Sequence, residues 1–118
     1  MDRKCVMIVD KNLPLGLIAN TTAILGTALG KLEGEIVTIL VLKGDEFLIR
    51  ELLKQANYYP NEVLVIDFCD LAQSCRDYSE YIDKMKLASE ASLKYFGICL
   101  YGTRTRINKL TGNLSLLK

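Results

Sequence analysis

Four short apolar runs, rich in β-branched residues, alternate along this chain with segments of helical periodicity. Strands are expected at Lys4–Asp10, Glu35–Leu42, Glu62–Cys69 and Phe96–Tyr101. Helices are expected from Pro14 to about Leu29, from Asp45 to about Ala56, over Asp77–Lys94 and over Ile107–Thr111. This alternation predicts an α/β fold, a single three-layer α/β/α domain over residues 1–118 with a four-stranded mixed, mostly parallel sheet.

The residue types exclude several kinds of chemistry. None of the 118 residues is a histidine, which removes Ser-His-Asp triads, Cys-His dyads and zinc sites that need imidazole. The four cysteines lie at Cys5, Cys69, Cys75 and Cys99, without a CxxC pair. We therefore expect no metal site and no cofactor, and we interpret the cysteines as free thiols of a reducing, cytoplasmic compartment.

Charge is distributed unevenly, although the net charge is only +1. Residues 94–118 carry five basic residues and no acidic residue, whereas residues 44–93 carry ten acidic and five basic residues. The basic tail is a candidate surface for contacting anions. The alternative is that it packs beside the acidic middle of the chain and balances its charge.

An uncharged stretch of 19 residues runs from Asn12 to Gly30. Its threonines, asparagines and glycines favour a soluble helix over a membrane span, so no membrane contact is expected. Gly26 and Gly30 are spaced one helical turn apart. They would let this helix approach its own sheet closely, or pack against a second copy in a homodimer.

Polar residues follow the expected strands at Asp10, Asp67, Asp70 and Tyr101. In open α/β sheets, ligands usually bind beyond the carboxyl ends of the strands. A crevice at that edge is therefore the first candidate site. An aspartate in this position also commonly forms a turn or caps a helix.

Two stretches resemble the type II peptidyl-tRNA hydrolase superfamily. The first is Val6-Met7-Ile8-Val9-Asp10-Lys11-Asn12-Leu13-Pro14-Leu15-Gly16, leading into Ile18-Ala19-Asn20. The second is Ile107-Asn108-Lys109-Leu110-Thr111-Gly112-Asn113-Leu114-Ser115-Leu116-Leu117. The chain is most similar to an uncharacterised, mostly bacterial branch of unknown function. Compared with that branch, it is expected to be shorter between Gly34 and Ile39.

The resemblance implies a site like that of the hydrolases, in which two of the hydrolase residues are replaced. The hydrolase lysine corresponds to Leu17, and the hydrolase glutamine corresponds to Asn20. The resemblance assigns catalytic positions to Asp67, which would orient water, to Asn20, which would hold the oxyanion, and to Lys109, which would meet phosphate. Further ligand-binding positions are expected at Asp10, Leu17, Gln73, Tyr101, Arg104, Asn108 and Thr111. Asn20, Asp67, Gln73 and Lys109 are expected to meet in one crevice.

Three functions remain open. Loss of the lysine favours a small-ligand-binding module with a hydrolase-like fold, because one such electrostatic group typically supplies about 10²–10³ in rate. The alternative is a diverged hydrolase acting on peptidyl-tRNA or another aminoacyl ester, with tRNA as partner. The third is an interaction protein that forms a homodimer through its first helix.

Overall fold

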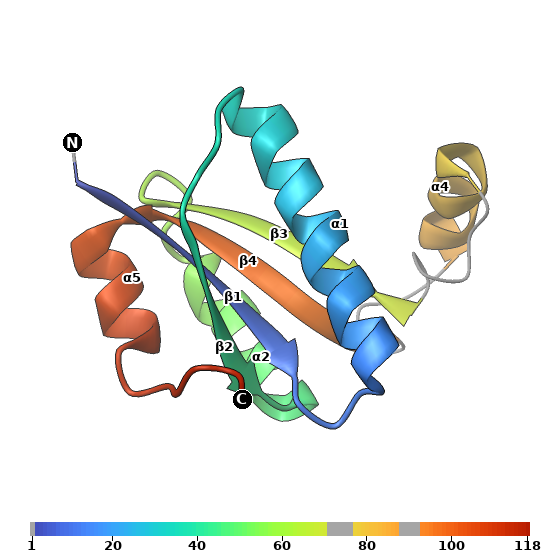
Figure 1. Cartoon of the computed structure of the whole chain (residues 1–118). Coiled ribbons are helices and arrows are strands. Elements are labelled where there is room, and N and C mark those ends of the chain that lie inside the picture. The colour runs from blue at the N-terminus through green and yellow to red at the C-terminus, as the bar shows by residue number, and fades with distance from the viewer. Residues whose placement is uncertain (1, 71–76, 88–92) are drawn as a thin grey trace.

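The computed structural model describes residues 2–70, 77–87 and 93–118. Its four strands are β1 (Arg3–Asp10), β2 (Ile39–Gly44), β3 (Val63–Cys69) and β4 (Tyr95–Thr103). Its helices, within the described ranges, are α1 (Leu15–Glu33), α2 (Glu46–Ala56), α4 (Tyr78–Leu87) and α5 (Arg104–Thr111). The predicted alternation of strands and helices is confirmed (Figure 1).

The strands form one mixed sheet in the order β2-β1-β4-β3. β1 and β2 are parallel, whereas β4 is antiparallel to both β1 and β3. The prediction of a mixed sheet is confirmed, but only one of the three strand pairs is parallel. Figure 1 shows the reason, since α4 lies beyond the end of β3 and does not cross a face of the sheet. The chain therefore enters β4 from the edge at which β3 ends, which reverses the strand.

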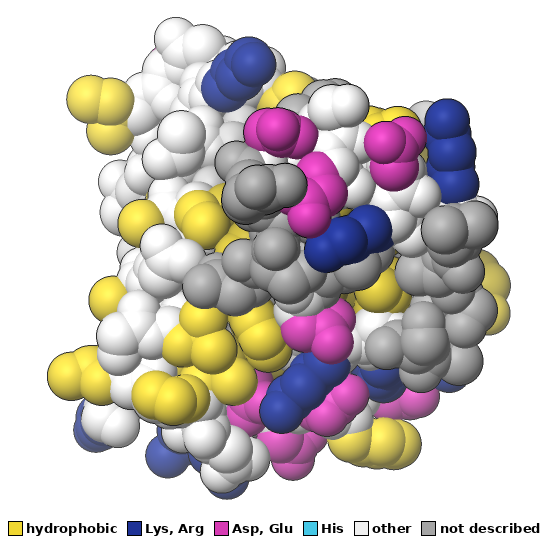
Figure 2. Space-filling view, turned by 90° about the vertical axis from the view of Figure 1, so that its right-hand side faces the viewer, with side chains coloured by type: hydrophobic (Ala, Val, Ile, Leu, Met, Phe, Trp, Pro, Cys, Tyr) yellow, Lys and Arg dark blue, Asp and Glu magenta, His cyan; other side chains and the backbone are white. Residues whose placement is uncertain are grey.

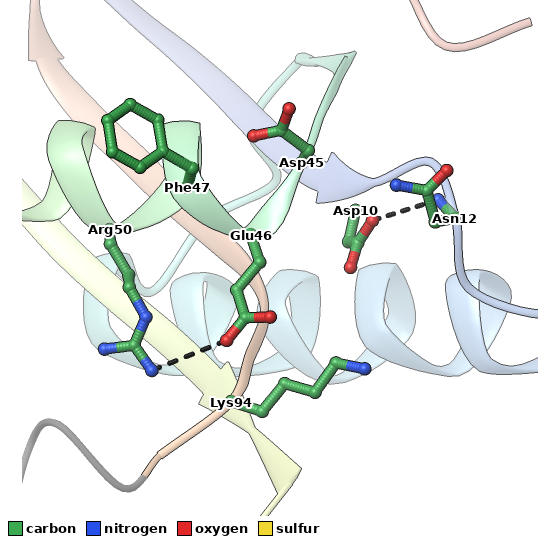
Figure 3. A pocket seen from close by; sticks show the side chains of 7 residues that line it. All are labelled: Asp10, Asn12, Asp45, Glu46, Phe47, Arg50 and Lys94. Carbon is green, nitrogen blue, oxygen red and sulfur yellow. Dashed lines mark hydrogen bonds and ion pairs between the residues drawn. The ribbon is translucent and has the colours of Figure 1, made fainter.

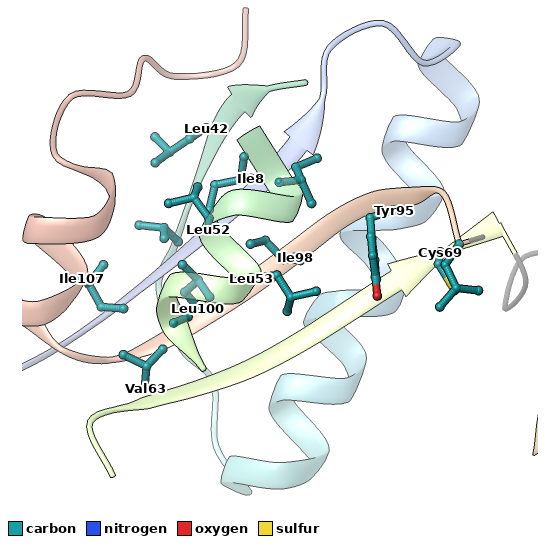
Figure 4. Packing of buried hydrophobic residues seen from close by; sticks show 14 residues of the cluster. Ile8, Leu42, Leu52, Leu53, Val63, Cys69, Tyr95, Ile98, Leu100 and Ile107 are labelled. Carbon is teal, nitrogen blue, oxygen red and sulfur yellow. The ribbon is translucent and has the colours of Figure 1, made fainter. Parts of the chain in front are cut away.

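Two hydrophobic cores lie on opposite faces of the sheet. On one face, α1 contributes Leu25 and Leu29 to a cluster with Met7, Phe68 and Cys99. The second cluster contains residues of α2 and α5 packed on the other face (Figure 4); among its members are Val6, Ile8, Leu42, Ile49, Leu52, Leu53, Ile98, Leu100 and Ile107. Successive residues of β1 and β4 point alternately into the two clusters. This alternation is expected for strands that are covered on both faces. The three-layer prediction is confirmed.

Several elements begin or end later or earlier than predicted. α1 continues to Glu33 and ends at Gly34, whose φ of 72° is the left-handed conformation that favours glycine. The β-branched residues before Ile39 are consequently not part of β2. α5 begins at Arg104, because the side chain of Thr103 accepts a hydrogen bond from the Arg106 amide and caps the helix.

The close approach of α1 to the sheet depends on a glycine of the sheet. A Cβ atom at Gly97 would lie 2.9 Å from the Thr21 side chain and 3.1 Å from the Ile8 carbonyl oxygen. A Cβ at Gly26 would make only an ordinary 3.7 Å contact with Met7, and one at Gly30 would meet nothing within 4 Å. The interpretation that Gly26 and Gly30 permit this packing is therefore wrong.

Among the helices of the described residues, α1 is long and apolar enough to cross a membrane, judged by length and composition alone. The mostly buried core helix of a soluble protein and a signal sequence near the N-terminus meet the same criterion, so a single such helix is weak evidence for a membrane span. Here α1 packs across β1, β3 and β4, and Leu25 and Leu29 are fully buried against the sheet. Its outer face keeps Ile24 and Leu32 exposed.

The C-terminal segment covers the outer edge of β2. The Lys43 amide donates a hydrogen bond to the Ser115 carbonyl (2.9 Å), and the Leu117 amide donates one to the Val41 carbonyl (2.9 Å). Leu114 packs against the α2-side core, whereas Leu116 is exposed. By covering this edge, the segment also protects the strand from pairing with other chains.

Candidate functional site

A polar hollow of about 540 Å³ opens at the carboxyl ends of β1 and β2. Its lining residues come from the end of β1, the first turn of α2 and the start of β4 (Figure 3): Asp10, Asn12, Asp45, Glu46, Phe47, Arg50 and Lys94. This is the edge at which α/β sheets usually bind ligands. Of the predicted site residues, Asp10 lines this hollow.

Asp10 is the most deeply placed charged group of the hollow, with only 4% of its surface exposed. One carboxylate oxygen accepts a hydrogen bond from the Asn12 amide at 2.9 Å, which forms the turn after β1. In Figure 3 the other oxygen points away from Asn12, toward the side on which Lys94 ends. A buried carboxylate is costly without hydrogen-bond donors, so this oxygen is suited to receive one from a ligand.

The first turn of α2 forms one wall. A Cβ at Gly44 would lie 2.7 Å from the Ile8 side chain, so only glycine fits where β2 leads into the helix. Asp45 caps the helix by accepting a hydrogen bond from the Leu48 amide at 2.8 Å, as predicted. Phe47 follows with 73% of its surface exposed. The wall thus presents a carboxylate beside an exposed aromatic ring.

Arg50 is already engaged by its neighbours. Its guanidinium lies 3.5 Å from the Glu46 carboxylate and 5.2 Å from the centre of the Tyr95 ring, and it donates a hydrogen bond to the Leu93 carbonyl. These contacts fix the side chain against the start of β4. Arg50 and Glu46 therefore largely neutralise one another in the wall.

The side chain of Lys94 enters the hollow from a backbone position that is held by two hydrogen bonds to Asp70. Its amide donates to the Asp70 carboxylate at 3.1 Å, and its carbonyl accepts from the Asp70 amide at 2.9 Å. Its side chain extends below Asp10 in Figure 3. Within the described part of the chain, no carboxylate lies within ion-pair distance of the Lys94 ammonium.

On this side of the molecule, the charged side chains of the described residues are mixed in sign. Figure 2 shows acidic and basic side chains interspersed, with hydrophobic side chains gathered toward one side of the view.

The three predicted catalytic residues do not meet in one crevice. Asn20 is exposed on α1, and Lys109 is exposed on α5, which packs on the opposite face of the sheet. Asp67 lies on the outer strand β3, where partial desolvation raises the pKa of its carboxyl although the residue remains exposed. The expectation of a shared crevice is not met, because the predicted groups project from both sides of the sheet.

The predicted ligand-binding residues on α5 have structural partners. Arg104 pairs with Asp2 at 2.7 Å, and the Asn108 side-chain oxygen accepts a hydrogen bond from Lys4 at 2.7 Å. The buried Thr111 hydroxyl donates to the Ile107 carbonyl at 2.8 Å. Of the basic tail, Arg106 pairs at 3.0 Å with Glu62 of the acidic middle of the chain, which supports the alternative that the two segments balance each other, whereas Arg104 pairs with Asp2 outside that segment.

Leu17 and Tyr101 belong to the hydrophobic core on the α1 side. Tyr101 is buried, and the Arg3 guanidinium lies 4.8 Å from the centre of its ring. Because β4 is antiparallel, Tyr101 lies toward the opposite edge of the sheet from Asp10, which corrects its predicted place at the ligand-binding edge. Gln73 lies outside the described residues.

Sequence reasoning missed most of the hollow. Asp45 was expected only as the start of a helix and Lys94 only as part of the basic tail, and Phe47 was not singled out. The available signal was the Gly44-Asp45-Glu46 helix start directly after an apolar strand. Among the described residues, no group of three or more Cys, Asp or Glu side chains is arranged to hold a metal ion.

Comparison with known proteins places the chain in a family. A family model described as "Protein of unknown function (DUF2000)" matches residues 3–39 and 35–118. The two matches overlap at 35–39, within the region expected to be shorter than in relatives. No curated protein matches the chain.

A solved structure has the same fold. It is that of a protein of unknown function, Atu0240, from Agrobacterium tumefaciens strain C58, with a TM-score of 0.85 and 16% sequence identity. The alignment covers 98% of each chain. At this identity the likeness concerns the fold alone, whereas the family match spans nearly the whole sequence: the chain belongs to the DUF2000 family of proteins of unknown function.

Proposed function

We propose that this DUF2000 protein is a small-ligand-binding module whose ligand occupies the hollow around Asp10. The observation that carries the proposal is a carboxylate that is 4% exposed, fixed by one hydrogen bond and open to a hollow of about 540 Å³. That volume is within the usual range for small-molecule sites, and the surrounding groups are few and convergent.

We also propose that the fold is related to the type II peptidyl-tRNA hydrolases. The stretches Val6–Asn20 and Ile107–Leu117 support this relationship. The placement of Leu17 favours binding over hydrolysis, since this side chain packs against the α1-side core where the hydrolases carry a lysine. The separation of Asn20 and Lys109 onto opposite faces weighs in the same direction.

The proposal is tested by amide chemical-shift mapping with ¹⁵N-labelled protein. Four probes of matched size are titrated separately: propionate, propylammonium, β-alanine and 1,3-propanediol. Saturable shifts at Asn12, Glu46 and Phe47, without shifts at Lys31 on the opposite face, support the proposal. If none of the probes shifts these amides at concentrations up to tens of millimolar, the proposal fails.

The hydrolase alternative has its own assay. Release of the peptide from N-acetyl-aminoacyl-tRNA is followed with the purified protein and with buffer alone. We expect equal rates. A rate well above buffer would replace the binding function by a hydrolase, and tRNA affinity that falls steeply with salt would support that outcome.

A further inference from the structure

The hollow holds two opposite charges that face each other without forming an ion pair. Asp10 lies at the end of β1, and Lys94 directly precedes β4, the strand next to β1 in the sheet. Their backbones are fixed by the β1–β2 pairing and by the two hydrogen bonds between Lys94 and Asp70. The geometry therefore presents a carboxylate and an ammonium across one polar hollow (Figure 3).

The other charges of the hollow are largely occupied. Arg50 and Glu46 pair with each other, and Asp45 caps α2 through the Leu48 amide. Among the described residues, the groups that remain to recognise a ligand are one oxygen of Asp10, the Asp45 oxygen that does not cap α2, and the Lys94 ammonium. A simple anion would face these carboxylates and a simple cation would face Lys94, so a ligand that carries both charges matches the hollow better than either.

We propose that the ligand is a small zwitterion, with an ammonium group that donates to Asp10 and an oxyanion, a carboxylate or a phosphate, that accepts from Lys94. This inference rests on the proposed function, since it names the ligand class of the same hollow. Phe47 also lines the hollow with an exposed ring, which is available to the carbon chain of a ligand at the rim. Hydrogen bonds to charged groups are the strong ones, so both ends contribute to affinity.

The test uses three-carbon probes that differ only in their end groups. β-Alanine, propionate and propylammonium are titrated by NMR at constant ionic strength. We expect β-alanine to bind about tenfold or more tightly than either singly charged probe. Phosphoethanolamine is titrated in parallel, and the ratio of its affinity to that of β-alanine assigns the oxyanion as phosphate or carboxylate.

Variants then assign each end. Lys94→Met should weaken β-alanine about tenfold while leaving propylammonium at least as tightly bound as in the wild type. Asp10→Asn should weaken β-alanine and propylammonium but not propionate. Asp10 is buried, so its variant could unfold, and a second test therefore uses the exposed Lys94. Lys94→Glu should reverse the ligand preference of the hollow, so that 1,3-diaminopropane binds more tightly than β-alanine. Lys31→Gln, on α1, is the matched control and should change nothing.

The outcomes separate this inference from the proposed function. If propionate or propylammonium alone binds in the hollow as tightly as β-alanine, or if Lys94→Met leaves β-alanine binding unchanged, the zwitterion is wrong and the small-ligand function stands. If no probe of the first panel binds there, both are wrong.

Discussion

Gly97 of β4 lies directly beneath Thr21 of α1, so that a Cβ atom at position 97 would come within 2.9 Å of the Thr21 Cγ2 atom. The Thr21 side chain is fully buried, and its hydroxyl donates to the Leu17 carbonyl at 2.7 Å. The Ile8 carbonyl lies 3.1 Å from the same Cβ position and belongs to the sheet backbone, which cannot move aside cheaply. This contact fixes the distance between helix and sheet.

Gly97→Ala is therefore expected to destabilise the protein by about 1–3 kcal/mol, since overpacking forces backbone or rotamer shifts. Urea unfolding followed by circular dichroism measures the change. An unchanged midpoint would show that α1 moves away from the sheet without cost.

Gly30→Ala is the matched substitution and should act in the opposite direction. Gly30 lies in the interior of α1, and a Cβ there meets nothing within 4 Å. Replacing a helix glycine by alanine usually stabilises by about 0.5–1 kcal/mol, because less backbone entropy is lost on folding. A loss of stability would indicate that the face around Gly30 is covered in solution, and sedimentation analysis would then show whether a homodimer covers it.

Asp67 gives the protein a defined dependence on pH. Partial desolvation raises the pKa of this carboxyl above its usual 3.8. The folded state then binds the proton more tightly than the unfolded state, so this group contributes most to stability at pH below 3.8, and that contribution is lost as pH rises through the higher folded pKa.

Asp67→Asn should consequently show a small rise in Tm relative to wild type at pH 7 and no difference near pH 3. Glu51→Gln, an exposed pair member on α2, is the control and should show no such gain. A Tm gain for Asp67→Asn that persists unchanged at low pH would contradict the assigned cause.

The fold could be predicted largely from the sequence, because each strand is a short, dense apolar run between clear helix signals. Val63–Cys69 and Tyr95–Thr103 match their expected positions to within two residues. The direction of β4 could not be predicted, since crossover length does not reveal that α4 lies beyond the sheet end. The start of β2 was also placed wrongly, because Ile36 and Val37 have the residue types of a strand but precede the pairing of Cys5 with Ile39.

The site was predictable only at Asp10. Its position at a strand end identified the correct edge of the sheet, whereas Lys94 and Phe47 are brought there by pairings between segments far apart in the sequence. The resemblance-based set failed as a group because the order of residues along a chain does not say which face of a sheet each helix covers. Asn20 and Lys109 show this directly.

The buried thiols should be unreactive in the native protein. Cys5 and Cys99 are buried with their sulfur atoms 3.5 Å apart, and the hydrogen bond between them, together with burial, raises the pKa of the Cys99 thiol. The same hydrogen bond lowers the pKa of the Cys5 thiol, so the protection of Cys5 rests on its burial, with 2% of its surface exposed. Alkylating reagents react readily only with thiolates that they can reach. Iodoacetamide at pH 8 should therefore leave Cys5, Cys69 and Cys99 unmodified in native protein and modify all of them in guanidinium, as measured by peptide mass spectrometry. Native labelling of Cys99 would contradict its burial.

Restoring the hydrolase lysine should not restore a hydrolase. Leu17→Lys would place an ammonium at the start of α1, on the face of the sheet opposite Lys109. Because Leu17 packs partly against the α1-side core, the substitution should also lower stability by about 1–2 kcal/mol. Leu17→Met is the control for packing.

Peptide release from N-acetyl-aminoacyl-tRNA should equal the buffer rate for wild type and both variants, since a developing oxyanion needs several converging groups and not one charge. Turnover by Leu17→Lys alone would show that the first turn of α1 carries the chemistry by itself, and the hydrolase alternative would then replace the ligand-binding function.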